Sequence, residues 1–373
     1  MSLLLLILVA GSAAFCVLAI LAAEQYRSVR PPVRADSPVE GISVLKPLHG
    51  LDEGLAENLQ SFFAQDYPAF EILFAVEEDC DPAVAAVKRL IADNPHIPAR
   101  LVIAGPSPIP NAKVYSLSRM IEEARHNLIV MADSDVRVEP EFLRIVEAEM
   151  SGDNVALVTS PYRAVAGRSI WSQLEALGLN TEFISGVLVA RMIGGMDFAL
   201  GPAIATRKAH IEEIGGFGEL QQYLAEDFVM GNRLAQKGYQ VVLSSYAIEH
   251  RIGSQGLGPN LSHRLRWNRS TRRSRPAGYI GQIFTHPLPI ALILWLWRPQ
   301  WWPVALAAIL IRYLAAWRAS QAIQAEISYF GLPFQDVLSL TMWIAGFFGN
   351  EITWRTRRFT IDRLGRFQPS GPA

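Results

Sequence analysis

The chain has 373 residues, with 34 basic and 35 acidic side chains and a net charge of −1. This length suits one catalytic domain with accessory segments. The near-neutral charge excludes a broad nucleic-acid-binding surface, which requires a clear basic excess. Half of the residues are hydrophobic and 18% are charged. The apolar excess lies at the two ends of the chain, which indicates insertion into a membrane.

Residues 2–23 carry no charged side chain and are long enough to cross a hydrocarbon core of about 30 Å at about 1.5 Å per residue. We expect an N-terminal transmembrane anchor over 1–25 and a linker over 26–40. A signal peptide is the alternative, because Gly11–Ala14 offers small residues, but the apolar run continues past them and no basic residue precedes it. The positive-inside rule then predicts a cytoplasmic catalytic domain, because three arginines follow the span: Arg27, Arg30 and Arg34.

From residue 41, apolar bursts alternate with amphipathic stretches, which is typical of strand-helix-strand units over a largely parallel sheet. The expected strands cover residues 41–45, 70–76, 99–104, 128–132, 156–160, 198–205 and 240–245. The expected helices between the early strands cover residues 51–65, 82–92 and 111–125. We therefore assign residues 41–278 to one α/β catalytic domain.

Three apolar stretches follow, at 283–297, 301–316 and 337–353, and only the last has a comfortable spanning length. We expect residues 279–354 to form membrane-embedded or re-entrant helices and residues 355–373 to form a basic tail. The number of crossings stays open. Three crossings would leave the C-terminus outside, whereas the arginines of the tail favour the cytoplasm.

The most informative acidic motif is Asp133-Ser134-Asp135, which follows the buried strand 128–132 directly. Open α/β sheets bind their ligands at this place. Two carboxylates there can hold Mg²⁺ or Mn²⁺, and such an ion neutralises a departing diphosphate. The alternative is a helix N-cap. His250 ends a later strand and is either a third metal ligand or a structural histidine, while Lys113 can place an ammonium near the phosphates.

Two further acidic groups lie beside expected elements. Glu226 and Asp227 precede a helical pattern, where a carboxylate can take the proton from an attacking hydroxyl or act as a helix cap. Glu77, Asp79 and Asp81 follow the strand 70–76 and can face a nucleotide.

An aromatic-basic motif, His263-Arg264-Leu265-Arg266-Trp267, comes before the apolar C-terminal part. Arg266 suits bidentate phosphate contacts, and Trp267 offers a flat surface for a sugar ring. The alternative is a basic patch that binds anionic lipid headgroups. Residues 170–192 have helical spacing and form either a helix that shapes the acceptor entrance or an ordinary core helix.

These motifs resemble the ceramide glucosyltransferase family, within the family-2-like inverting GT-A glycosyltransferases. The resemblance covers nearly the whole chain and rests on SVLKPLHGLDEGLAENLQSFFAQDYP, EEDCDPA, NAKVYSL, ADSDVRV, YLAEDFVM, HRLRW and TWRTRRF. It implies a GT-A nucleotide-sugar-binding fold with a largely parallel sheet. The roles it implies are Asp81, beside Glu77 and Asp79, toward the nucleotide; Asp133 and Asp135 at the metal; Asp227 as general base; and Arg266 and Trp267 as the last two motif positions.

One position departs from the family pattern, because His263 stands where relatives have Gln or Arg. Bacterial relatives that are associated with hopanoid biosynthesis have a similar layout. We therefore expect a multi-pass enzyme of a bacterial inner membrane that moves N-acetylglucosamine or glucose from a UDP-sugar to a lipid hydroxyl, first a hopanoid and second ceramide. The remaining alternatives are a processive polysaccharide synthase and a non-catalytic membrane sensor of nucleotide sugars or lipids.

Overall fold

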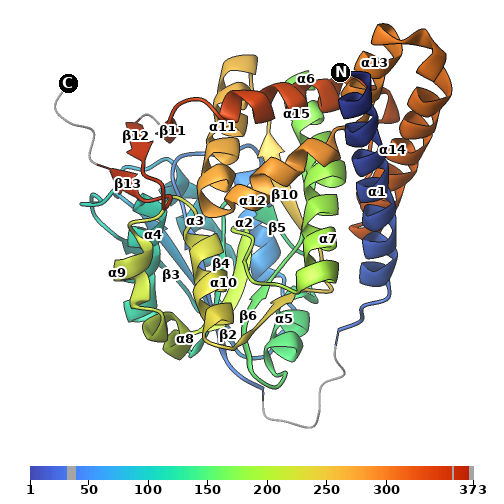
Figure 1. Cartoon of the computed structure of the whole chain (residues 1–373). Coiled ribbons are helices and arrows are strands. Elements are labelled where there is room, and N and C mark those ends of the chain that lie inside the picture. The colour runs from blue at the N-terminus through green and yellow to red at the C-terminus, as the bar shows by residue number, and fades with distance from the viewer. Residues whose placement is uncertain (32–38, 355–356, 369–373) are drawn as a thin grey trace. The chain divides into compact units, whose positions relative to one another are not determined.

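A computed structural model describes residues 1–31, 39–354 and 357–368 of the chain (Figure 1). The chain forms two compact units, and each is built from more than one stretch of sequence. The first, called the sheet unit, consists of Arg30–Tyr162 and Met196–Gly253. The second, called the helical unit, consists of Met1–Val29, Arg163–Gly195 and Ser254–Ala373.

The sheet unit contains a seven-stranded sheet in the order β3-β2-β1-β4-β8-β6-β9. Its strands are β1 (Ile42–Pro47), β2 (Phe70–Val76), β3 (Ala99–Ile103), β4 (Leu128–Ala132), β6 (Val155–Thr159), β8 (Ala203–Arg207) and β9 (Gln240–Leu243). β1 pairs in parallel with β2 and β4, and β2 with β3, whereas β8 is antiparallel to β4 and β6. The expected, largely parallel α/β sheet is confirmed, although the strand expected over 198–205 begins only at Ala203.

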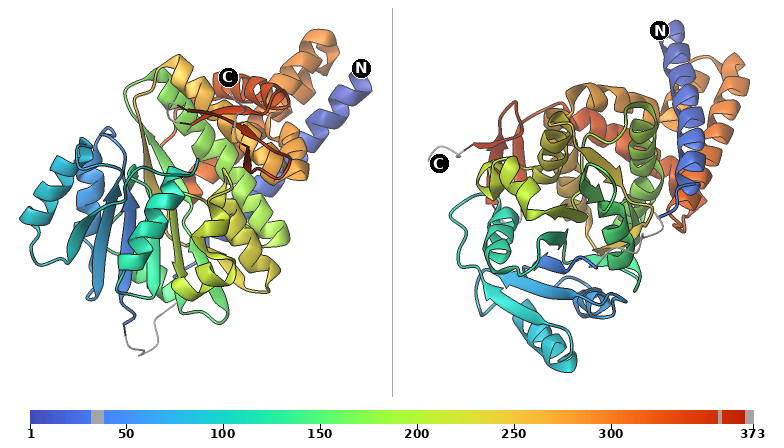
Figure 2. Two further views of the ribbon diagram at one scale, coloured as in Figure 1. Left: turned by 90° about the vertical axis from the view of Figure 1, so that its left-hand side faces the viewer. Right: turned by 90° about the horizontal axis from the view of Figure 1, so that it is seen from below.

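Three helices connect the first four strands: α2 (Leu55–Phe63), α3 (Ala83–Asp93) and α4 (Ala112–Glu123). Right-handed crossovers place α2 and α3 on one face of the sheet. α4 returns from the edge strand β3 to β4 and so lies on the opposite face, as the left view of Figure 2 shows. Because β1, β2 and β4 are parallel, the residues that follow them gather at one edge of the sheet.

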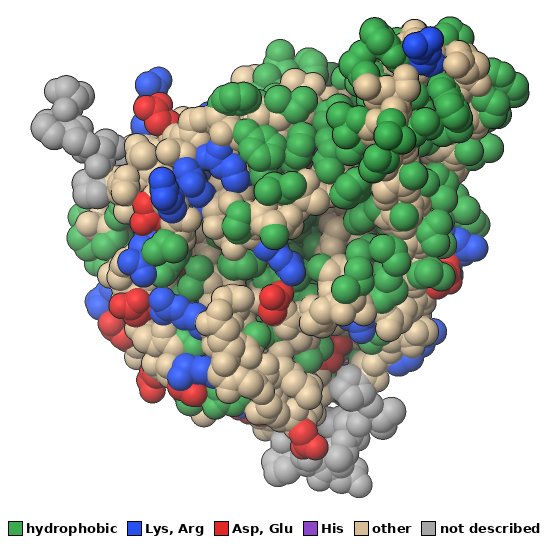
Figure 3. All heavy atoms as spheres, viewed as in Figure 1, with side chains coloured by type: hydrophobic (Ala, Val, Ile, Leu, Met, Phe, Trp, Pro, Cys, Tyr) green, Lys and Arg blue, Asp and Glu red, His purple; other side chains and the backbone are tan. Residues whose placement is uncertain are grey.

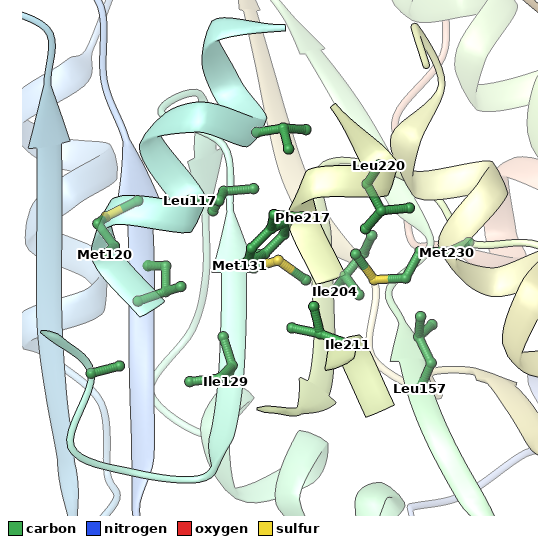
Figure 4. Close-up of a cluster of buried hydrophobic side chains, with 14 of the residues drawn as sticks. Leu117, Met120, Ile129, Met131, Leu157, Ile204, Ile211, Phe217, Leu220 and Met230 are labelled. Carbon is green, nitrogen blue, oxygen red and sulfur yellow. The ribbon is translucent and has the colours of Figure 1, made fainter. Parts of the chain in front are cut away.

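The sheet unit also contains β5 (Val136–Arg137), α5 (Phe142–Met150), α8 (Lys208–Glu213), α9 (Gly216–Leu220), α10 (Glu226–Gln236) and β10 (Ile248–Gly253). β5 and β10 pair antiparallel through Val136 and His250. A buried hydrophobic cluster joins the sheet to α4, α9 and α10 (Figure 4), and it includes Leu117, Met131, Leu157, Ile204, Phe217 and Met230.

A glycine allows α10 to pack closely against the segment that leads into β8. A Cβ at Gly231 would lie 2.5 Å from Ala199 N and 2.6 Å from Phe198 C. Any side chain there would therefore push the helix away from the backbone of these two residues. The close packing fixes the position of the helix and, with it, its first residues, Glu226 and Asp227.

The helical unit contains α1 (Ser2–Arg27), α6 (Ile170–Gly178), the π-helix η1 (Leu179–Phe183), α7 (Ile184–Gly194), α11 (Leu257–Ser274), α12 (Pro276–Gly281), η2 (Gln282–Thr285), α13 (Pro287–Trp297), η3 (Pro299–Trp301), α14 (Trp302–Ala322), η4 (Tyr329–Gly331) and α15 (Leu332–Gly346). The strand β7 (Tyr162–Ala166) precedes α6. α1 packs against α7, α13 and α14 (Figure 1). Small and apolar side chains fill part of this contact: Val9, Ile290, Ala291, Leu294, Ala305 and Ala308.

Three helical segments of the described chain are long and apolar enough to cross a membrane: Ser2–Arg27, Ile170–Gly194 and Pro299–Ala322. The pair Pro276–Thr285 and Pro287–Trp297, bent by 56°, would be a fourth. Figure 3 shows hydrophobic side chains gathered where α1, α13 and α14 lie, and these include the exposed Leu3, Ile7, Leu292, Trp295, Leu296, Trp302 and Leu310. A surface of this kind indicates a membrane protein.

The expectation that only the stretch 337–353 has a comfortable spanning length is wrong, because Pro299–Ala322, over the stretch 301–316, is long and apolar enough to cross a membrane. α15 ends at Gly346, and Glu351–Trp354 forms β11, which pairs antiparallel with β12 (Arg357–Ile361). β13 (Phe367–Gln368) completes this small sheet. Gly349 adopts a φ of +75°, a conformation that ends helices readily. Residues 32–38 of the predicted linker, and residues 355–356 and 369–373 of the predicted tail, lie outside the described residues. The division of the chain into membrane anchor, linker, catalytic domain, membrane helices and tail stays a prediction.

Candidate active site

Asp133 and Asp135, which follow β4, each contact a basic side chain from another element. Lys113 Nζ lies 2.7 Å from Asp133 Oδ1, and His250 Nε2 lies 3.1 Å from Asp135 Oδ2. Burial raises the pKa of Asp133, and Lys113 opposes this effect. Burial also acts to raise the pKa of Asp135, but His250, Lys46 and Lys113 together outweigh it and the net shift is downward. Asp135 is therefore the carboxylate better suited to stay ionised.

Lys113 joins this acidic pair to the second one at the start of α10. Its ammonium lies 3.4 Å from Glu226 Oε1 and also donates to the carbonyl oxygen of Gly201 at 3.4 Å. Burial acts to lower the pKa of Lys113. The carboxylates of Asp133 and Glu226 outweigh this effect and raise that pKa above its ordinary value. The side chain therefore carries a fixed positive charge between the two acidic motifs.

Asn111 fixes the same junction and was not predicted as a site residue. Its Oδ1 accepts the N–H of Val114 at 3.1 Å and so caps α4. Its Nδ2 donates to Glu226 Oε2 at 3.2 Å and to the carbonyl oxygen of Tyr223 at 3.0 Å. The amide is fully buried. Asn111 thus caps the N-terminus of α4 and also holds the first turn of α10.

Asp227 is a buried carboxylate beside a second acid, Glu226. Burial and the adjacent Glu226 raise the pKa of Asp227 to about 7, while Lys113 opposes them. A Cβ at Gly201 would stand 2.8 Å from Asp227 Oδ2, so the carboxylate lies directly against that glycine. A general base works best with a pKa near the working pH. Asp227 therefore has the protonation behaviour that such a role needs.

Lys46, at the end of β1, supports the turn that carries Asp133 and was also missed. Its side chain is fully buried, its Nζ donates to the carbonyl oxygen of Asp133 at 2.5 Å, and it lies 4.0 Å from the centre of the Phe62 ring. Burial lowers the pKa of Lys46 to about 7, and the carboxylates of Asp133, Asp135 and Asp52 oppose this shift. Ser134 Oγ donates to Asp52 Oδ2 at 2.5 Å. Lys46 on β1 and Asp52 in the loop after β1 thus hold the turn that carries Asp133 and Ser134.

The acids after β2 lie in different settings. The N–H of Gly50 donates to both oxygens of Asp81 at 3.0 Å, and that of Ala83 donates to Asp81 Oδ1 at 2.8 Å. Asp81 therefore holds the loop after β1 onto the start of α3. Asp79 is 70% exposed and pairs with Lys88 at 3.1 Å. Glu77 is partly buried at the end of β2, and the roles of all three acids toward a nucleotide stay predictions.

The HRLRW motif lies on α11, in the helical unit. His263 Nδ1 contacts Glu175 Oε1 on α6 at 2.7 Å, and its ring lies 5.0 Å from that of Trp267. The Trp267 ring also lies 6.0 Å from that of Phe183. The histidine that departs from the family pattern is thus paired with a buried carboxylate on a neighbouring helix. The predicted roles of Arg266 and Trp267 toward the sugar nucleotide stay predictions.

The fit of a divalent ion rests on Asp133, Asp135 and His250. Within the described residues, no group of three His, Cys, Asp or Glu side chains is arranged to hold a metal by itself. Asp135 Oδ1 is buried and has no hydrogen-bond partner in the described part of the chain. Mg²⁺ is bound in many enzymes by one or two carboxylates together with substrate phosphates. The residues fit an ion of that kind.

Comparisons with known proteins show which sequences and folds this chain is similar to. A family profile described as Glycosyl transferase family 21 matches residues 3–367. Ceramide glucosyltransferases 1 and 3 of Caenorhabditis elegans are both 29% identical to the chain, over 57% and 63% of its length. The matched parts are 46% and 51% of these relatives, so the chain spans about half the length of the curated relatives it matches.

Among solved structures, a mannosyltransferase from Pyrobaculum calidifontis in complex with GDP-Man and Mn²⁺ is similar to this chain with a TM-score of 0.56. The sequences are 16% identical, and the alignment covers 93% of this chain and 99% of the other. At this identity the likeness concerns the fold, and it confirms the expected GT-A type architecture.

Proposed function

Because the chain belongs to glycosyl transferase family 21, we propose that it moves a hexose from a UDP-sugar to the hydroxyl of a membrane lipid, with inversion at the anomeric carbon. The observation that carries this proposal is the position of Lys113. Its ammonium lies between Asp133, at 2.7 Å, and Glu226, at 3.4 Å. These contacts support a single site in which the Asp133 end binds the diphosphate and the Asp227 end accepts the proton.

In the proposed reaction, Asp227 accepts the proton of the acceptor hydroxyl while that oxygen attacks the anomeric carbon. The bond between the sugar and the phosphate breaks, and UDP leaves with the electron pair. The charge of Lys113 stabilises the negative charge that develops on the diphosphate. A divalent ion held by Asp133 and Asp135, with His250 as a candidate third ligand, would neutralise the same charge when bound.

Further residues complete the proposal. Asp81, with Glu77 and Asp79, faces the nucleotide, Arg266 contacts the diphosphate and Trp267 lies near the sugar. These assignments rest on the motifs. The proposed location is a membrane, with the sheet unit on the cytoplasmic side, and the apolar surface of α1, α13 and α14 supports insertion.

The two candidate acceptors, ceramide and a hopanoid, are supported by different observations. Ceramide is the acceptor named for the relatives, so UDP-glucose with ceramide is the first pair to test. A hopanoid with UDP-N-acetylglucosamine has the support of the sequence layout alone and comes second. Nothing in the described helices favours a polymer channel, and the intact acidic sites argue against a non-catalytic sensor.

The test is incubation of the purified full chain, in phosphatidylcholine vesicles, with each donor against each acceptor. We expect a single sugar on one lipid, detected by mass spectrometry, with an anomeric configuration opposite to that of the donor in the NMR spectrum. The Asp227→Asn variant is the background. Lipid that remains unmodified in all four incubations would contradict the proposal, and so would a polymeric product.

A further inference from the structure

Two irregular helical segments meet inside the helical unit. One is the π-helix η1, which carries Glu182 between α6 and α7. The other is the break between η2 and α13, where Thr285 and His286 lie and the helix direction changes by 56°. Among apolar helices, irregular backbone is found where protein encloses it or where it lines a polar site. π-Helical turns occur often at functional sites.

The two segments bring three polar side chains together. Thr285 Oγ1 donates to Glu182 Oε1 at 3.2 Å, and His286 Nδ1 lies 3.7 Å from the same oxygen, beyond hydrogen-bonding distance. The His286 side chain is 1% exposed and that of Glu182 is 18% exposed. Ionisable side chains cost free energy when they are buried among apolar membrane-type helices, so such a pair is a candidate functional site.

His286 is the side chain that indicates a ligand. Neither of its ring nitrogens has a hydrogen-bond partner among the residues that the structure describes. Buried polar groups in proteins are nearly always paired, and a neutral imidazole offers one donor and one acceptor. A ligand that carries both a donor and an acceptor, such as a hydroxyl or a secondary amide, would satisfy it. Partial exposure of Glu182 leaves a way for such a group to reach the cluster.

A neighbouring ion pair gives the π-helix its own structural support. Arg312 Nε and Nη2 contact Asp336 Oδ2 and Oδ1 at 2.9 and 2.8 Å, and Nη2 also donates to Thr181 Oγ1 at 3.3 Å. This bidentate pair ties α14 and α15 to η1. The charge of Glu182 interacts with this pair, so the pair borders the cluster that Glu182 forms with Thr285 and His286.

The cluster also adjoins the HRLRW motif. Phe183, the residue after Glu182, contacts the ring of Trp267 with 6.0 Å between the ring centres. Trp267 is the motif residue that the proposed function assigns to the sugar. The polar cluster and the aromatic residue therefore lie on adjoining elements of the same unit.

We propose that Glu182, Thr285 and His286 bind the uncharged, hydroxyl- and amide-bearing head of the acceptor lipid. The inference rests on the proposed function in one respect, namely that the bound lipid is the acceptor. The negative charge of Glu182 disfavours a phosphate-bearing headgroup, whereas its oxygens accept hydrogen bonds from hydroxyls. The chemistry of the cluster thus separates a ceramide-like head from the bulk phospholipids around it.

Two variants test the site, the isosteric Glu182→Gln and the smaller His286→Asn, with Glu326→Gln and His96→Asn as exposed controls. We expect each site variant to raise the KM for ceramide about tenfold, as for the loss of one buried hydrogen bond. The KM for the UDP-sugar should change less than twofold, because the donor motifs are untouched. The controls should match the wild type. An unchanged ceramide KM in both folded site variants overturns the proposal, as does an equal rise in the KM for both substrates.

A binding experiment separates this site from the proposed function. A photoreactive ceramide in phosphatidylcholine vesicles labels the full chain without any UDP-sugar, and both variants should lose most of the label. If the wild type forms no glycolipid, the proposed function fails and labelling alone decides the site. Labelling equal to the wild type then overturns the site, and lost labelling supports it. Should either variant fail to elute as a single folded species, Thr285→Val replaces it, because this change removes only the hydroxyl, which contacts Glu182 and the carbonyl oxygen of Gln282.

Discussion

Gly201 lies directly against Asp227, since a Cβ at residue 201 would stand 2.8 Å from Asp227 Oδ2. The carbonyl oxygen of Gly201 also accepts from Lys113 Nζ at 3.4 Å. A second glycine acts at the other side, because Gly231 lets α10 approach the backbone of Phe198 and Ala199. The position of the proposed base thus depends on two residues that have no side chain.

Gly201→Ala tests this dependence. The new methyl group would displace the Asp227 carboxylate, which is the end of a short side chain with little room to adjust. We expect kcat to fall at least about tenfold, as for a misplaced catalytic group, while the KM for the UDP-sugar changes less than twofold. Gly218→Ala is the matched control, because nothing lies within 4 Å of a Cβ there. Equal rates for the two variants would contradict the contact.

Asp227→Asn tests the base itself. The amide keeps the shape of the side chain but cannot accept a proton, so turnover should fall about 10²- to 10⁴-fold. Binding of the UDP-sugar, measured by calorimetry, should stay within a factor of two. Turnover like that of the wild type would exclude Asp227 as the base. Loss of donor binding together with turnover would instead assign it to the donor site.

The pH profile follows from the same residue. Burial and the neighbouring Glu226 raise the pKa of Asp227 to about 7, so the carboxylate is protonated and inactive below that pH. We expect kcat/KM to rise about tenfold per pH unit below pH 7 and to level off above it. Glu226→Gln removes the repelling charge and should move the midpoint to lower pH. A profile that is flat between pH 5.5 and 8.5 would argue against a base in this environment.

Lys46→Met tests the support beneath the acidic turn. The change removes the ammonium that donates to the carbonyl oxygen of Asp133 and leaves that oxygen without this partner. We expect a loss of about 1–3 kcal/mol in the free energy of unfolding and a KM for the UDP-sugar that rises several-fold. The exposed Lys237→Met is the control, since a surface ion pair contributes about 0–1 kcal/mol. Unchanged stability and donor KM would show that the contact supports nothing.

Removal of divalent ions tests the proposed metal site. Treatment with a chelator and dialysis should abolish lipid glycosylation, and Mn²⁺ or Mg²⁺ should restore it. Asp135→Asn should raise the Mn²⁺ concentration for half-maximal rate about tenfold or more, because the amide loses the charge that attracts the ion. A chelated enzyme that keeps its full rate would exclude the metal.

The sequence predicted those parts of the site that follow from local pattern. The buried run 128–132 ends at Asp133, and parallel strands bring such ends to one edge, so the place of Asp133 and Asp135 could be foreseen. The sequence also indicated Lys113 near the phosphates, but it did not indicate the contacts that Asn111 and Lys113 make with Glu226. Their contacts with Glu226 span more than a hundred residues of sequence and exist because α4 crosses back over the sheet to β4. No local signal encodes that approach.

The same limit explains the errors. Apolar composition over 337–353 indicated a comfortable spanning length, but α15 ends at Gly346 and residues 351–354 pair as a strand. His263 departs from the family pattern, but the sequence did not indicate that its ring contacts Glu175 on α6. The close approaches at Gly201 and Gly231 depend on which atoms pack against each residue. The presence of a glycine in the sequence does not indicate which residue packs there.

The interleaving of the two units has a consequence for biosynthesis. α1 leaves the ribosome first, yet its packing partner α14 is the segment Trp302–Ala322, which is translated only after the whole sheet unit. α7 can therefore cover part of α1 early, whereas the contacts of α1 with α13 and α14 form only when these last helices have been translated. For the same reason, a soluble fragment cut at residues 41 and 278 would retain α6 and α7 but lack both α1 and α14. Such a fragment would aggregate through its orphaned apolar helix, so expression of this protein calls for the full chain and a lipid or detergent host.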